Sequence, residues 1–241
     1  MSGNSSVITG APASLVSDWR SAASLIDHSL LKPDAVREEI AALCDEALHY
    51  GFHCVMVNPT HLSYAVARLR GTSVKAASVV GFPLGANLTV TKLAEAEALL
   101  RSGAQEVDAV LNIAALKARD RALLETEMRS LVRLVHDRGA LLKVIMENAL
   151  LNQEEKIFAC ALALEAGVDF VKTSTGFAAS GATAADVVLM RGVVGIKMGV
   201  KAAGGIRTAS QLVDMVEAGA NRIGASASVQ IVQEMGAPAE N

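Results

Sequence analysis

Lys172 stands at a position where a lysine is costly, at the end of a short apolar segment of the chain. The segment 168–172 is typical of a buried strand, and the polar turn 173–176 follows it directly. Burial disfavours the charged form of a lysine and lowers its pKa. The neutral amine that results is a nucleophile toward carbonyl carbon. The pattern therefore predicts covalent, amine-based chemistry at Lys172.

Four further charged residues lie in, or at the end of, other apolar segments: Asp27, Asp108, Glu147 and Lys201. A second lysine near Lys172 would lower the pKa of both amines by like-charge repulsion, and a nearby aspartate would keep one of them charged. Such a group would supply a neutral nucleophile and a separate cation or proton donor. A single such residue in a strand is more often one half of a structural ion pair, but five that converge at one barrel mouth favour an active site.

The elements that would position these residues alternate along the chain. Strands are expected near 24–27, 53–57, 75–80, 106–111, 141–147, 168–172, 198–201 and 221–224. Helices are expected near 34–50, 60–70, 89–102, 116–138, 151–166, 182–192, 208–218 and 226–234. Eight strand–helix units match a (β/α)8 TIM barrel, which needs about 250 residues. A doubly wound open sheet is the alternative, but no GxGxxG follows the first strand.

In this reading, residues 14–241 form a single α/β barrel domain, since no linker rich in Pro, Gly or Ser interrupts 20–235. A short N-terminal helix at 14–23 is placed to cover the bottom of the barrel. Residues 1–13 are expected to be a flexible arm. This arm has no basic region before an apolar run, so it is not a secretory signal.

Composition narrows the function classes. The net charge of −3 argues against nucleic-acid binding. The sequence contains no apolar run of about 18 residues, so no membrane span is expected. The three cysteines form no CxxC pair, which favours a reduced, cytoplasmic setting with Cys54 as a small buried apolar group. The histidines lack metal-ligand spacing, so no metal site is expected. His28 could orient Asp27 or be purely structural.

Two small-residue loops follow the last two expected strands, at 201–208 and 222–228. In a TIM barrel the active site lies at the C-terminal ends of the strands, and a phosphate is often bound by the loops after strands seven and eight. Backbone N–H groups there can point at an anion. Gly204, Gly205, Gly224 and Ser226 fit that use, although ordinary tight turns would have the same composition.

Ordered motifs along nearly the whole chain resemble the deoxyribose-phosphate aldolases, a family of class I, Schiff-base aldolases. They are LIDHSLLKP (25–33), CVMVNP (54–59), VVGFPLGANLTVTK (79–92), EVDAVLNIAALK (106–117), LKVIMEN (142–148), DFVKTSTGF (169–177), GVKAAGGIRT (199–208) and RIGASAS (222–228). The resemblance implies reversible cleavage of 2-deoxy-D-ribose 5-phosphate to acetaldehyde and D-glyceraldehyde 3-phosphate. It also implies a cytoplasmic homodimer without cofactor or metal.

The resemblance assigns a Schiff base to Lys172, a proton relay to Asp108 and Lys201, and a polar helper role to Asp27. It assigns contacts with the substrate phosphate to Gly176, Gly204, Gly205, Gly224 and Ser226. Three positions depart from the commoner family pattern: Ser29, Asn148 and Ala227. The last of these removes one possible phosphate-binding hydroxyl.

Two other functions remain open at this point. The first is a Schiff-base aldolase of the same fold that acts on a different phosphorylated sugar, which fold analogy does not exclude. The second is a non-catalytic sugar-phosphate sensor. A sensor is expected to have lost at least one of Asp108, Lys172 and Lys201, and this sequence keeps all three.

Overall fold

Eight parallel strands close into a barrel in the computed structural model, which describes residues 16–239. The strands pair in chain order, and β8 pairs with β1 to complete the ring. They are β1 (Ile26–Leu30), β2 (Cys54–Val57), β3 (Lys75–Val80), β4 (Glu106–Val110), β5 (Leu141–Ile145), β6 (Phe170–Lys172), β7 (Gly199–Ala203) and β8 (Arg222–Ala225). The predicted (β/α)8 barrel is confirmed.

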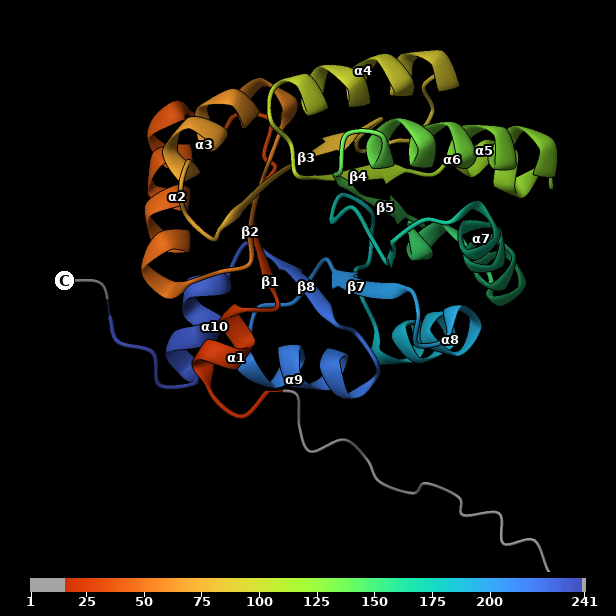
Figure 1. The fold of residues 1–241 in the computed structure, drawn as a ribbon. Coiled ribbons are helices and arrows are strands. Elements are labelled where there is room, and N and C mark those ends of the chain that lie inside the picture. Colours follow the sequence, from red (N-terminus) through yellow and green to blue (C-terminus); the bar gives the residue numbers. More distant parts are fainter. Residues whose placement is uncertain (1–15, 240–241) are drawn as a thin grey trace, which may run out of the picture.

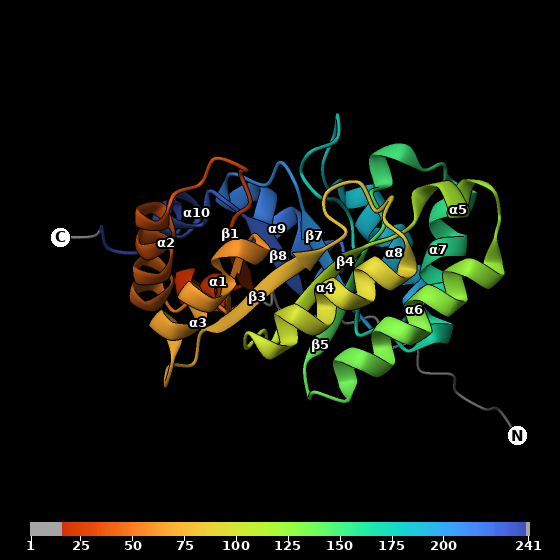
Figure 2. The ribbon, with the colours of Figure 1, turned by 90° about the horizontal axis from the view of Figure 1, so that it is seen from above.

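Helices surround the barrel, as Figure 1 shows from one side and Figure 2 after a quarter turn. They are α1 (Trp19–Ala23), α2 (Arg37–Tyr50), α3 (Leu62–Leu69), α4 (Thr89–Arg101), α5 (Ile113–Lys117), α6 (Arg121–His136), α7 (Gln153–Ala166), α8 (Ala184–Val194), α9 (Ala209–Glu217) and α10 (Ser228–Glu234). Two single 3₁₀ turns, Pro59–His61 and Asn148–Leu150, follow β2 and β5.

Local sequence sets the boundaries of α7 and thereby the position of β6. The Asn152 side chain accepts a hydrogen bond from the Glu155 N–H (2.9 Å), and the Glu155 carboxylate accepts one from the Asn152 N–H (2.8 Å). This capping box starts the helix. Gly167 ends it in the left-handed conformation (φ 83°) that glycine adopts without strain. The chain then enters β6, which ends at Lys172 as predicted.

The helix predicted over 116–138 is wrong as a single element. Arg119 adopts a left-handed conformation (φ 56°), which separates α5 from α6. Asp120 then caps α6 by accepting a hydrogen bond from the Leu123 N–H (3.0 Å). An aspartate in this position favours a new helix start over a continuous helix.

Three predicted strand ends are also wrong, and the differences move candidate residues. Strand β1 continues to Leu30, because Ser29 and Leu30 still pair with β2, so Asp27 is the second residue of its strand and not the last. Strand β7 continues to Ala203, which places Lys201 in its middle. Strand β5 ends at Ile145, and Glu147 lies beyond it with φ 55°.

The short helix expected at 14–23 is observed as α1, which leads into the start of β1 and packs against α10. The predicted flexible arm, 1–13, lies outside the described residues. Within 16–239, none of the helices combines the length and the apolar character that crossing a membrane requires.

Apolar side chains pack on both sides of the barrel wall. The larger cluster lies between the strands and the surrounding helices. A smaller cluster contains Cys54, Met56, Ala77 and Val79, all buried, and Cys54 is indeed fully buried as predicted. The rest of the interior holds charged side chains from six of the strands, listed here: Asp27, Glu106, Asp108, Lys143, Lys172, Lys201 and Arg222.

Candidate active site

Lys172, Lys201 and Asp108 meet inside the barrel. Lys172 on β6 and Lys201 on β7 are direct neighbours across the strand pair. Each ammonium nitrogen lies 2.9 Å from the same atom, Oδ2 of Asp108. Lys172 is only 3% exposed, and the other two residues are fully buried. The structure thus brings together the three residues that the sequence named as nucleophile and proton relay.

Asp27 and Lys143 extend this group on the side of β1 and β5. Asp27 accepts a hydrogen bond from Lys201 and lies 3.8 Å from the Lys143 ammonium. Lys143 donates to Oδ1 of Asp108 at 2.9 Å, so the two oxygens of Asp108 have different partners. Oδ1 is held by Lys143, and Oδ2 is left to the two lysines of the predicted site.

Glu106 and Arg222 form a further pair next to these residues. Arg222 donates from Nη1 to Oδ1 of Asp27 (2.8 Å) and to Oε2 of Glu106 (3.0 Å). Glu106 also contacts the Lys143 ammonium at 2.5 Å and His53 Nε2 at 3.2 Å. The ion pairs therefore run without a break from Lys172 to Glu106 and Arg222.

Burial and the charges of this network shift the pKa values of the buried lysines differently. Burial lowers the pKa of Lys172 to about 8, the like charges of Lys201 and Lys143 add to the effect, and Asp108 opposes it. Lys143 differs because the effect of burial is outweighed by Asp108, Asp27 and Glu106, which raise its pKa. Lys172 therefore loses its proton far more readily than Lys143 does.

The carboxylates remain ionised for the same reason. Burial would raise the pKa of Asp108, but Lys143, Lys172 and Lys201 outweigh it and hold that pKa well below its usual range. Burial also acts on Asp27, whose pKa is nevertheless lowered by Lys201, Lys143 and Arg222. Both side chains are thus hydrogen-bond acceptors at neutral pH, and Asp108 can receive a proton only transiently.

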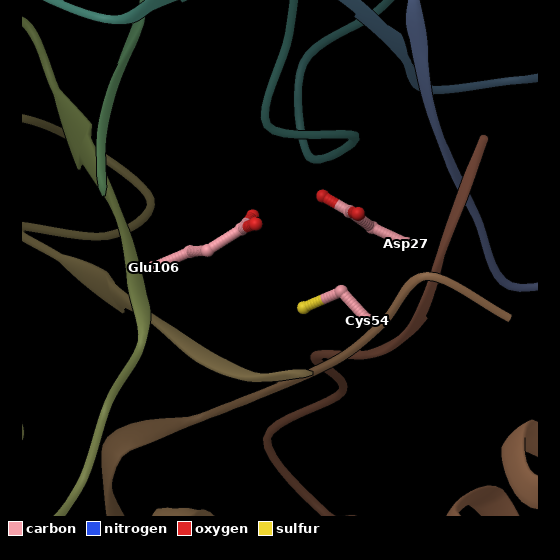
Figure 3. Close-up of side chains that lie close together, drawn as sticks. All are labelled: Asp27, Cys54 and Glu106. Atoms are coloured by element: carbon pink, nitrogen blue, oxygen red, sulfur yellow. The ribbon is translucent and has the colours of Figure 1, made fainter. Parts of the chain in front are cut away.

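Asp27, Cys54 and Glu106 point toward a common space from β1, β2 and β4 (Figure 3), with potential ligand atoms within 4.8 Å of one another. Both carboxylates are already paired with cations, Lys201 and Arg222 on Asp27, and Lys143 and Arg222 on Glu106. Burial raises the pKa of the Cys54 thiol well above its usual value, which disfavours the thiolate that metals bind. The donor set fits an ion-pair network better than a metal site.

A pocket of about 360 Å³ opens at the C-terminal ends of the strands and reaches Lys172. All five residues predicted to contact phosphate line it: Gly176, Gly204, Gly205, Gly224 and Ser226. Ser29 lines it as well, with its hydroxyl donating to the Asp27 carbonyl oxygen (2.9 Å). Lys172 and the predicted phosphate contacts therefore share one cavity.

The loop after β6 and the loop after β7 are fastened to each other at the pocket. The Ala182 N–H donates to the Gly204 carbonyl oxygen (3.0 Å), and a Cβ at Gly181 would overlap that same carbonyl. Gly204 itself has φ 91°, a conformation that strains other residues. Glycines at 181 and 204 thus permit a close approach of two backbones that shape the cavity.

Gly224 lines the pocket, and it also has a steric role that the sequence did not suggest. A Cβ at this position would lie 3.0 Å from Cε of Lys201 and 2.9 Å from Cβ of Ala203. Glycine therefore leaves the space that the Lys201 side chain needs to reach Asp108. The effect is steric, and it acts through the side chain of Lys201.

A family model described as DeoC/LacD family aldolase matches residues 21–238, nearly all of the described chain. The chain belongs to the DeoC/LacD family of aldolases. It is therefore a carbon–carbon lyase.

Similar proteins agree with this assignment. Deoxyribose-phosphate aldolase from Aciduliprofundum boonei is 55% identical over 218 residues, covering 90% of this chain and 98% of that protein. The protein of the same name from Thermococcus kodakarensis is 54% identical, covering 92% and 99%.

Solved structures show the same fold. A tetrameric deoxyribose phosphate aldolase from Aeropyrum pernix superposes with a TM-score of 0.84 at 35% identity, covering 89% of this chain and 91% of that one. A structure described as QR15, an aldolase, has the same TM-score at 39% identity, covering 88% and 95%.

Sequence reasoning missed three of the charged residues inside this aldolase: Glu106, Lys143 and Arg222. Charges at strand ends were the ones expected at the site, whereas Glu106 and Arg222 begin their strands and Lys143 lies in the middle of β5. Strand alternation contained the missing signal, because Glu106 is two residues before Asp108 and shares its face. Lys143 is the register partner of Asp108 on the adjacent strand.

His28 does not orient Asp27 in this aldolase. Consecutive residues of a strand point to opposite faces, and His28 Nε2 contacts Glu46 on α2 at 2.6 Å. Its ring also packs against Phe52, with the ring centroids 4.9 Å apart. The structural interpretation of His28 is the correct one, since it fastens α2 to the outside of β1.

Glu147 supports the site indirectly. Its carboxylate accepts a hydrogen bond from the hydroxyl of Thr175, and this hydroxyl accepts one from the Phe177 N–H (3.1 Å). The next residue, Asn148, donates from its backbone N–H to the Thr173 carbonyl oxygen (2.9 Å) and is buried away from the pocket. These contacts fix the turn that follows Lys172.

Proposed function

We propose that this aldolase cleaves 2-deoxy-D-ribose 5-phosphate reversibly to acetaldehyde and D-glyceraldehyde 3-phosphate, through a Schiff base on Lys172. The observation that carries the proposal is the position of the Lys172 and Lys201 nitrogens, each 2.9 Å from one carboxylate oxygen of Asp108, with Lys172 lining the pocket. Relatives that are 50–55% identical are named deoxyribose-phosphate aldolase, which supports this substrate.

The reaction starts at the aldehyde carbon of the open-chain sugar. The neutral amine of Lys172 attacks C1, and loss of water gives an iminium. This cation accepts the electron pair of the C2–C3 bond when the C3 hydroxyl loses its proton, and glyceraldehyde 3-phosphate leaves. The enamine that remains on Lys172 is protonated at carbon and hydrolysed to acetaldehyde, which restores the amine. The lysine itself is the electron sink, so the scheme requires no cofactor.

Asp108 and Lys201 move the protons in this scheme. Asp108 Oδ2 is the acceptor nearest to the Lys172 nitrogen, and Lys201 shares that oxygen. A proton taken up at Asp108 can therefore be passed on to substrate or water at the same point. Asp27 holds Lys201 in place through its own hydrogen bond, which makes it the polar helper.

The pocket residues beyond Lys172 hold the phosphate end of the substrate. Gly176, Gly204, Gly205, Gly224 and Ser226 supply small side chains and backbone N–H groups. Binding this end fixes the sugar so that C1 lies at the amine. Two exposed cations that the sequence reasoning did not single out, Lys32 and Arg207, also line the pocket and favour an anionic group there.

The quaternary and cellular setting belongs to the same proposal. We take residues 14–241 as the catalytic domain, the enzyme as a cytoplasmic homodimer, and a small phosphorylated sugar as its ligand. A tetramer, the state of the Aeropyrum pernix enzyme, is the alternative to a dimer. Light scattering of the purified protein distinguishes a dimer from a tetramer.

Acetaldehyde release tests the substrate. The purified enzyme, given 2-deoxy-D-ribose 5-phosphate, is expected to form acetaldehyde and glyceraldehyde 3-phosphate in equal amounts, measured by coupled reduction with NADH. A second phosphorylated sugar, such as fructose 1,6-bisphosphate, is the comparison. Preferential cleavage of that sugar would support the rival aldolase, and cleavage of neither would support the sensor.

The pH dependence of kcat/KM follows from the pKa of Lys172. Because attack requires the neutral amine and burial lowers this pKa to about 8, kcat/KM is expected to fall as the pH decreases below about 8. The acid limb is measured with 2-deoxy-D-ribose 5-phosphate between pH 5 and 10, in buffers of constant ionic strength. A limb near the ordinary lysine pKa of about 10.4 would contradict the assignment.

Arg207→Ala is expected to raise KM for 2-deoxy-D-ribose 5-phosphate about 10- to 100-fold, the loss typical of a hydrogen bond to a charged group. The KM for unphosphorylated 2-deoxy-D-ribose should remain unchanged, because the cation acts only on the phosphate end. Steady-state kinetics with both sugars checks this. Arg70→Ala is the control, because Arg70 lies on the loop that leads into the start of β3 and does not line the active-site pocket. Equal effects on both sugars would remove Arg207 from phosphate binding.

A further inference from the structure

Glu106 and Arg222 are buried charges for which the reaction scheme has no use. Arg222 is 6% exposed and Glu106 is 4% exposed. Neither Glu106 nor Arg222 is among the described residues that line the active-site pocket. Burying an ion is costly in free energy unless the ion is well paired. An explanation is therefore needed for an ion pair placed at the start of β4 and β8, beneath the reactive lysine.

The surroundings hold Glu106 and Arg222 in one arrangement. The Arg222 guanidinium lies 5.3 Å from the centroid of the Phe170 ring. Phe170 in turn fills space that Gly199 leaves open, since a Cβ at Gly199 would overlap the ring. His53 contacts the remaining side of Glu106. The pair is thus enclosed, and its charges are poorly screened by solvent.

The charge of the whole ion network depends on Lys172. Besides His53, the network joins seven charged side chains of the described chain: Asp27, Glu106, Asp108, Lys143, Lys172, Lys201 and Arg222. Three are acids and four are bases. The network is neutral only when one base is uncharged, and Lys172 is the base that faces the pocket.

We propose that Glu106 and Arg222 are positioning residues that set the protonation state of Lys172, by fixing the net charge of this network without touching the substrate. The inference rests on the proposed role of Lys172 as the Schiff-base amine. It assigns opposite effects to Glu106 and Arg222. Glu106 favours the ammonium form of Lys172, and Arg222 favours the neutral amine.

The titratable and charged groups that face Lys172 come from every side of the barrel. From the strands, and from the residue just before β2, they are Asp27, His53, Cys54, Glu106, Asp108, Lys143, Lys201 and Arg222. At the mouth they are Lys32, Glu147 and Arg207. Only Glu106 and Arg222 change in the test below, so a difference between variants reports on these two charges.

Removal of either charge gives a prediction with a definite sign. Glu106→Gln keeps the size and the acceptor oxygen but adds one net positive charge, so the pKa of Lys172 is expected to fall. Arg222→Met adds one net negative charge, so that pKa is expected to rise. One unit charge roughly 10 Å away, at an effective dielectric constant of about 20, corresponds to a shift of about one pH unit. The double variant keeps the net charge of the network.

The experiment measures the pKa of Lys172 directly through its chemistry. Each full-length protein is treated with acetaldehyde and sodium cyanoborohydride from pH 5 to 10, and the rate of irreversible modification of Lys172 is followed by peptide mass spectrometry. The midpoint is expected about one pH unit lower in Glu106→Gln and about one unit higher in Arg222→Met. In the double variant it should return to the midpoint of the unmodified protein.

Glu127→Gln is the matched control. Glu127 on α6 forms another buried ion pair, with Lys92 on α4 (2.7 Å), outside the ring of strands. Its substitution also leaves a buried lysine without its carboxylate. The midpoint for Lys172 should stay unchanged, because that charge belongs to a separate group. A shift as large as that of Glu106→Gln would indicate a general effect of destabilisation.

The outcomes separate this inference from the proposed function. If the unmodified protein gives no adduct on Lys172, the proposed role of Lys172 fails. If the adduct forms but both variants shift in the same direction, or neither shifts, the inference is overturned. Should Arg222→Met fail to fold, Glu106→Gln decides alone, because a merely structural role lowers the yield or the rate without moving the midpoint downward.

Discussion

Lys172→Ala is expected to abolish turnover of 2-deoxy-D-ribose 5-phosphate, with kcat lowered on the order of 10⁴-fold or more. The side chain supplies both the nucleophile and the electron sink, and no other group can replace two functions at once. The neighbouring Lys201 cannot take over, because Asp27 and Asp108 hold its ammonium. The measurement is a steady-state assay with enough enzyme to detect residual activity.

Trapping with borohydride separates loss of the nucleophile from loss of the fold. With substrate and borohydride, the unmodified enzyme is expected to carry one covalent adduct on Lys172, and Lys172→Ala none. Lys156→Ala, which removes a lysine that binds Asp186 on the outer helices, is the control and should be trapped normally. An adduct found only on Lys201 would contradict the assignment of the Schiff base.

Lys201→Leu has the second largest expected effect, a loss of activity on the order of 10²- to 10³-fold in a protein that remains folded. This variant removes the proton carrier that shares Asp108 Oδ2 with Lys172. It also removes a like charge that lowers the pKa of Lys172. The acid limb of the rate profile should therefore move to higher pH as the maximum rate falls.

Circular dichroism and thermal unfolding provide the check on folding for this variant. A lower melting temperature is expected, because Asp27 and Asp108 each lose a buried partner. Lys143 and Arg222 still neutralise both carboxylates, which is why the barrel should survive. Near-wild-type activity in a folded Lys201→Leu protein would remove Lys201 from the mechanism.

The sequence predicted the barrel and the central part of the site because both leave local signals. The glycine at 167 marks the end of a helix, and the strand that follows ends at Lys172. The same kind of local signal failed at β1 and β7. Nothing in the residues around Asp27 or Lys201 shows that pairing with the next strand continues for several residues, since that pairing is made by distant parts of the chain.

The contact between Glu106 and Arg222 could not be predicted from the sequence for a related reason. Glu106 and Arg222 are 116 residues apart, and their contact depends on strand tilt and register around the whole barrel. A charged residue at the start of a strand is usually solvent-exposed. Only the closed ring of strands shows that both side chains turn inward and meet the pair formed by Asp108 and Lys143.

The backbone contact between the loops at Gly181 and Gly204 has a consequence for redesign of the substrate range. Because two backbones touch there, a mutation that shifts either the loop with Gly176 or the loop with Gly205 is expected to disturb the other loop as well. Engineering toward unphosphorylated aldehydes should therefore leave this backbone contact intact. Lys32 and Ser226, on the loops after β1 and β8, offer freedom to change charge and volume without disturbing it.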